Sequence, residues 1–266
     1  MRPSCILFVL FFASTGFAQT CVELVPKLME TSGMNRSLMS TTETFKDRIT
    51  DREDEGSMLV QDRQKLLKAL NGSFDALRIN DIVRQGLIAK CDSKSTAEAI
   101  RQLQSSLAQR MLKLEADVET PENSARMRRY VRAMSLQTPH TSRVKLVDGV
   151  LDATGYADLL ADAVMDISVE MLSAPTTTRP PKGEIDQMKA KMRAQTLHNV
   201  ESAMMFVYKN ASDEELTEYV ALLHSPELKS FFKQSNELYL SAIKSEAASI
   251  AAQLRKIDSE SEDISR

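Results

Sequence analysis

The sequence predicts an all-α protein of two tandem, related helical bundles that follow a cleaved signal peptide. Its 266 residues include only 8 Gly, 8 Pro and no Trp, whereas residues that favour helices, such as Ala, Leu, Met, Glu, Lys and Gln, are plentiful. No segment alternates apolar and polar residues with the period of a strand. The run LMETSGM at 28–34 returns as VLDATGY at 150–156, and later segments match again at a spacing of about 120 residues, which indicates a duplication.

Residues 1–18 have the form of a secretory signal peptide. Arg2 supplies the positive start, residues 6–13 are almost wholly apolar, and Ala18 ends a small-x-small cleavage site. The apolar run is shorter than the roughly 20 residues that a transmembrane helix needs; an ordinary buried helix is the other interpretation. We expect cleavage near Ala18, a periplasmic or secreted protein, and no transmembrane segment in the mature chain.

The repeat divides the mature chain near residue 140. Residues 19–140 are expected to form the first, diverged helical repeat, residues 141–258 the second, and residues 259–266 a frayed polar tail. Gly33 and Gly155 end the first helix of each repeat. The expected helices are 22–32 and 144–154, 35–50 and 157–173, 59–90 and 184–209, one starting near 95 and its match after 212, a last helix from 226, and an extra helix over 122–136.

Two patterns mark the starts of the last two helices. Ser212 and Glu215 fit a capping box, in which each side chain binds the backbone of the other residue. Ser225 and Pro226 form a structural turn, because Ser225 caps the final helix and Pro226 suits its first position. In the first repeat we expect Ser95 to cap the corresponding helix.

The second repeat resembles a family of bacterial exported, all-helical domains of unknown function. The resemblance is carried by SDEEL at 212–216 and LLHSPELK at 222–229, which are similar to the family's E-E-L and Ser-Pro-x-Gly-x-Lys signature, and by LDATG at 151–155. It covers about 144–250, with 22–120 as a diverged second copy. Leu223 replaces the usual aromatic residue and Leu228 the usual Gly. The resemblance implies a helical fold and secretion, and it implies no reaction.

Cys21 and Cys91 are the two cysteines that remain after the leader is removed. In an oxidising compartment they could form a disulfide, which would close a loop of about 70 residues and stabilise the fold by roughly 4 kcal/mol. Neither cysteine has a Cys-x-x-Cys partner or a nearby His, so a reactive thiol is disfavoured.

One helix of the second repeat carries a row of carboxylates spaced by four residues: Asp158, Asp162, Asp166 and Glu170. Unpaired like charges at this spacing destabilise a helix. The row is either a solvated face, or an interaction surface for a basic partner, or it pairs with arginines. Lys189 and Arg193 are one candidate set of partners. The other is the cluster on the extra helix, which could also bind an anionic envelope component: Arg126, Arg128, Arg129 and Arg132.

The composition favours binding over catalysis. A net charge of −3 provides no overall field for nucleic acid, and we expect no cofactor and no catalytic or metal residues. The predicted function is a non-catalytic envelope interaction or chaperone-like module, whose partner is an unknown protein or envelope component. An envelope hydrolase with a site between the repeats, using His198 or His224, is one alternative. A periplasmic metal-binding protein, based on His198 with Glu201 or on Met188 with Met192, is another.

Overall fold

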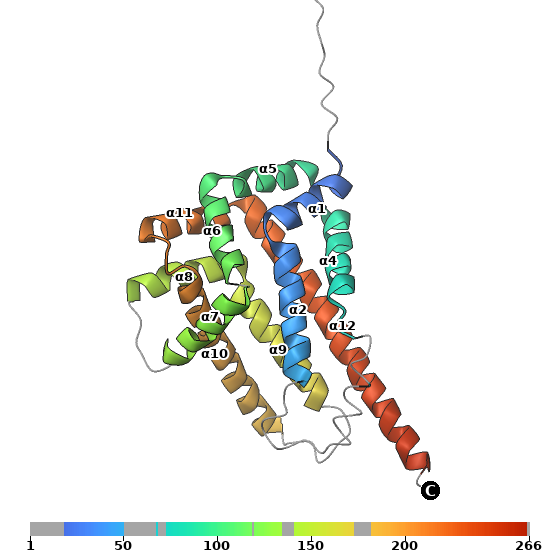
Figure 1. Ribbon diagram of the computed structural model, residues 1–266. Coiled ribbons are helices and arrows are strands. Elements are labelled where there is room, and N and C mark those ends of the chain that lie inside the picture. Colours follow the sequence, from blue (N-terminus) through green and yellow to red (C-terminus); the bar gives the residue numbers. More distant parts are fainter. Residues whose placement is uncertain are drawn as a thin grey trace, which may run out of the picture.

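The computed structural model describes residues 19–50, 68, 73–118, 120–134, 141–172 and 182–264, and every regular element among them is a helix (Figure 1). The predicted all-α class is therefore confirmed. The predicted signal peptide lies outside the described residues. The helices are α1 (Cys21–Thr31), α2 (Met34–Thr50), α4 (Ala76–Lys90), α5 (Ser93–Leu103), α6 (Ser106–Asp117), α7 (Pro121–Met134), α8 (Thr141–Thr154), α9 (Tyr156–Leu172), α10 (Lys182–Val207), α11 (Asp213–Leu223) and α12 (Pro226–Ile264).

The helices before and after residue 140 pack in the same order. α1 packs on α2, α4 and α5, and α2 packs on α4; likewise α8 packs on α9, α10 and α11, and α9 packs on α10. The turns after the first helix of each set also agree, since Gly33 has a φ of +71° and Gly155 a φ of +64°. This left-handed backbone favours glycine, which has no Cβ to clash, so the prediction that these glycines end the two helices is confirmed.

The last helices of each set cross to the other set. α12 packs along α9 of its own set and along α4 and α5 of the first, whereas α6 packs on α11 and α7 on α10. Figure 1 shows α12 as a long helix that passes both α4 and α9. The buried apolar side chains consequently form one continuous cluster, which includes Leu24 of α1, Met111 of α6 and Ile250 of α12.

A glycine permits the close approach of α12 to α4. A Cβ built on Gly86 would lie 2.5 Å from Cδ2 of Leu238, which is too short for two carbon atoms in contact. A side chain at this position would therefore require the end of the Leu238 side chain to shift.

The capping predictions for the second set are confirmed. Ser212 and Glu215 form the reciprocal capping box at the start of α11, and α12 begins at Pro226. The Ser225 Oγ accepts a hydrogen bond of 3.4 Å from the backbone N–H of Leu228. These local signals therefore placed both helix starts correctly.

The expected cap of α5 is wrong. α5 begins at Ser93, and its N-cap is Asp92, whose carboxylate accepts hydrogen bonds from the backbone N–H and the hydroxyl of Ser95 at 2.9 and 2.6 Å. A carboxylate satisfies the free N–H groups and also complements the positive end of the helix dipole. The earlier aspartate therefore caps the helix in place of Ser95.

The C-terminal segment is more regular than expected. α12 continues to Ile264, through most of the predicted polar tail, 259–266. No Gly or Pro interrupts residues 227–264, so nothing in the backbone stops the helix there. Among the described residues, no helix is long and apolar enough to cross a membrane.

Candidate functional site

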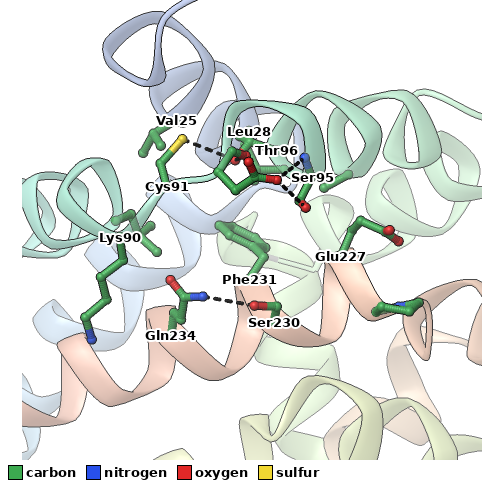
Figure 2. Close-up of a pocket in the computed structure, with 14 residues that line it drawn as sticks. Val25, Leu28, Lys90, Cys91, Ser95, Thr96, Glu227, Ser230, Phe231 and Gln234 are labelled. Carbon is green, nitrogen blue, oxygen red and sulfur yellow. Dashed lines mark hydrogen bonds between the residues drawn. The ribbon is translucent and has the colours of Figure 1, made fainter.

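A pocket of about 300 Å³ opens where α1, the end of α4, α5 and the start of α12 meet (Figure 2). Its floor consists of buried apolar side chains: Val25, Leu28, Leu87, Ala99 and Phe231. Its mouth carries polar groups: Lys90, Asp92, Ser95, Glu227, Ser230 and Gln234. Figure 2 shows the Phe231 ring rising from α12 into the space below α5. An apolar floor with a polar mouth can accept an amphipathic group.

Hydrogen bonds hold the mouth in place. The Ser95 hydroxyl and backbone N–H donate to Asp92, and these bonds lower the pKa of the Asp92 carboxyl. Gln102 Nε2 donates to Glu227 Oε2 at 3.2 Å, and Gln234 Nε2 donates to Ser230 Oγ at 2.9 Å. With Lys90, the mouth presents two carboxylates and one ammonium group, so it favours a partner with positive charge.

A disulfide forms part of the pocket wall. Cys21 and Cys91 are bonded with their Cα atoms 5.9 Å apart, and Cys91 lines the pocket. The bond joins the first residue of α1 to the corner between α4 and α5. It therefore fixes the relative positions of three of the four helices that surround the pocket.

The helix caps allow the pocket to be compared with the second set of helices, residue by residue. α5 and α11 both have 11 residues and start after N-caps at Asp92 and Ser212. Ser105 and Ser225 likewise precede α6 and α12. Counting from these caps, Ala99 of α5 corresponds to Tyr219 of α11, Ser95 to Glu215, and Ser230 of α12 to Arg110 of α6.

Larger residues occupy the corresponding positions of the second set. Tyr219 is 2 % exposed where the first set has Ala99. Arg110 Nε lies 2.5 Å from Glu215 Oε1, where the pocket has Ser230 and Ser95. By this count, small residues of the pocket stand at three positions where the other set has a tyrosine and an ion pair.

Around this filled site, two buried tyrosines share one carboxylate. The hydroxyls of Tyr208 and Tyr219 donate to Glu115 Oε1 at 2.6 and 3.1 Å. Burial, followed by the negative charge of Glu115, raises the pKa of both phenols well above the usual value. The tyrosines therefore stay neutral donors that link α11 and the turn just after α10 to α6. Sequence reasoning missed this cluster because its members are far apart in the chain.

The acidic row is partly paired. Arg193 of α10 forms ion pairs with both Asp158 and Asp162 of α9. The side chains of Asp166 and Glu170 lie outside the described residues. The partner of Asp158 and Asp162 is thus Arg193, which belongs to the second set of helices. It is one of the two residues, Lys189 and Arg193, that the sequence offered as one candidate set of partners.

The predicted arginine cluster lies on another face. Arg126, Arg128, Arg129 and Arg132 are exposed on α7, which packs against α10. The acidic row on α9 and the arginines on α7 therefore both lie on helices that pack against α10. The ion pairs observed for Asp158 and Asp162 are made to Arg193 of α10.

The histidines lie outside the pocket. His224 is the C-cap of α11, and neither it nor His198 lines the pocket of Figure 2. Partial burial raises the pKa of Glu201, and the charge of Asp148 raises it further, whereas His198 lowers it. Among the residues that the structure describes, no three His, Cys, Asp or Glu side chains are grouped so that they could hold a metal ion.

Comparisons of the chain with protein-family models, with curated proteins and with solved structures find no match.

Proposed function

We propose that this protein is an exported, non-catalytic binding module, and that the pocket among α1, α4, α5 and α12 is where its partner binds. The partner is a protein segment or envelope component that offers an apolar side chain beside a cationic group. One observation carries the proposal: Ala99 lines an open pocket, whereas the position that corresponds to it, counted from the helix caps, holds the much larger and buried Tyr219.

The proposal includes an internal duplication. The matching helix contacts, the paired glycine turns and the corresponding caps of α5 and α11 support two related helical bundles, in keeping with the resemblance to exported domains of unknown function. The crossing of α7 and α12 to the opposite bundle is what one expects of two copies that exchanged their last helices. After a duplication, one copy can keep a filled core while the other acquires a pocket.

Export is the second part of the proposal. The leader-like residues 1–18 indicate secretion, and a disulfide between Cys21 and Cys91 suits the periplasm or the cell exterior, where such bonds persist. A bond that lines the pocket would also preserve its shape outside the cell.

The size and charge of the pocket indicate its ligand class. A volume of about 300 Å³ is at the lower end of the range for ligand sites, so it suits one or two side chains of a partner better than a large cofactor. Burial on Leu28 and Phe231 would supply the free energy of binding. Asp92 and Glu227 would favour an adjacent lysine or arginine of the partner.

Photo-crosslinking in the exporting cell tests the proposal. A photoreactive residue at Ser230, in the mouth, should yield adducts, and one at exposed Ser245 on the same helix should not. The Ala99→Tyr variant, which copies the filled site, should abolish the adducts at Ser230. Ala97→Tyr is the matched control, because Ala97 is exposed on α5.

Ser95→Glu provides a second test that does not disturb the core, since Ser95 is exposed at the mouth and the change copies Glu215. Loss of adducts in Ala99→Tyr and Ser95→Glu, with retention in Ala97→Tyr, supports the pocket. Adducts that persist unchanged in both pocket variants would show that the partner binds elsewhere.

A further inference from the structure

We propose that the outward face of α7 docks on an anionic membrane surface. We call this surface the basic face; it consists of Arg126, Arg128, Arg129 and Arg132 of α7 and of Lys209, which lies in the turn just after α10. The basic face is separate from the pocket. The pocket-lining helices α1 and α5 and the start of α12 lie at the top of Figure 1, whereas α7 lies lower in that view.

The structure turns the arginines outward. Tyr130 of α7 packs its ring 5.5 Å from that of Phe206 in α10, and Met134 is buried with 9 % exposure. At 100° per residue, Arg128, Arg129 and Arg132 fall on the half of the helix that faces away from these two side chains. Arg126 lies one turn before Tyr130, on the side toward α10, and all four arginines are exposed. The sequence 126–132 therefore forms a basic stripe about 9 Å long.

Lys209 extends the basic stripe beyond α7. Its Nζ lies 3.5 Å from the centre of the Phe206 ring, and that ring in turn contacts Tyr130 of α7. Partial burial and the charge of Arg126 lower the pKa of Lys209, which places these two cations near each other. The whole chain has a net charge of −3, so this concentration of positive charge is a local feature.

The packing of α7 decides how it can meet a membrane. A free basic helix would insert its apolar face between lipids, but Tyr130 and Met134 already pack inward. The helix can therefore meet lipids only through its guanidinium groups, which bind headgroup phosphates. Exposed guanidinium groups on one helix can contact a planar surface together, and each arginine near an anionic surface strengthens binding about fivefold.

Vesicle co-sedimentation with the full chain provides the test. The protein should bind vesicles of equal parts phosphatidylglycerol and phosphatidylcholine, should not bind pure phosphatidylcholine, and should dissociate at high salt. The double variant Arg128→Gln, Arg129→Gln should weaken binding about 25-fold. The matched control is Arg84→Gln, Arg101→Gln, which removes the same charge from arginines that pair with Asp81 and Glu98.

Three results would overturn the proposal: no binding to the anionic vesicles, equal weakening in the control variant, or binding to soluble polyphosphate without binding to vesicles. The last result would assign the basic face to a soluble polyanion. The Ala99→Tyr variant should bind vesicles like the parent protein, so failure of the pocket proposal and failure of this one can be told apart.

Discussion

Glu246 of α12 should be a critical residue for the stability of the fold. It is 6 % exposed, and its Oε2 accepts the backbone N–H of Phe74 at 3.0 Å and the Arg78 guanidinium at 2.7 Å. Phe74 is fully buried and has a φ of +50°, a left-handed conformation that costs an L-residue about 1–2 kcal/mol. Glu246 therefore holds a strained residue at the entrance to α4.

The cost of removing this carboxylate follows from its contacts. Glu246→Ala leaves the buried N–H of Phe74 without its charged acceptor, which costs about 1.5–3 kcal/mol. The ion pair with Arg78 adds at most about 1 kcal/mol, because the Arg78 side chain is 49 % exposed. We expect a loss of about 3 kcal/mol. Glu246→Gln keeps an acceptor oxygen for Phe74, so it should lose only about 1 kcal/mol.

Urea denaturation, followed by far-UV circular dichroism, measures these losses. The midpoint should fall in the order parent, Gln, Ala, with an unchanged slope. The control Glu237→Ala, at an exposed position of the same helix, should stay within about 0.5 kcal/mol of the parent. If Glu246→Ala were as stable as Glu237→Ala, Glu246 would not hold the Phe74 turn.

Three further outcomes follow from the same structure. Cys91→Ser, which opens the bond to Cys21, should lower the free energy of unfolding by roughly 4 kcal/mol, and the parent in reductant should match it; an unchanged denaturation midpoint would contradict the bond. Gly155→Ala and Gly33→Ala should each cost about 1 kcal/mol because of the positive φ, and equal midpoints of parent and variants would refute this. Stability should fall as the pH rises above about 10, because the phenol of Tyr219 ionises in the unfolded chain, whereas its raised pKa keeps it neutral in the native state. In a pH series of thermal melts, Tyr219→Phe should show a shallower fall than the parent protein.

Local sequence patterns predicted the helices well. They failed to identify the correct residue where two nearby candidates suited the same role. Ser212 and Pro226 marked helix starts because caps act through neighbouring backbone groups. The sequence predicts Ser95 as the cap of α5, whereas Asp92 caps it in the structure. Both residue types favour N-caps, so a capping pattern alone does not fix which residue begins the helix. In the same way, the row that begins at Asp158 had two sets of basic candidates, and the choice of Arg193 depends on how α9 and α10 pack.

The pocket could not be predicted from the sequence. Ala99 is an ordinary residue on a helix, and it becomes important only because Phe231, more than a hundred positions later, lies beneath the same opening. Its counterpart Tyr219 fills the equivalent place by reaching Glu115. These are contacts between residues distant in the chain, which helical periodicity does not encode.

By itself the sequence determined the helical class, most of the helix boundaries and the two glycine turns, since propensity, capping and backbone sterics act within a few residues. Tertiary structure alone decided which helices cross between the two sets, that their apolar faces merge into one core, and where a cavity remains. Those features depend on side-chain volumes brought together from opposite ends of the chain, and packing is a property of the assembled helices.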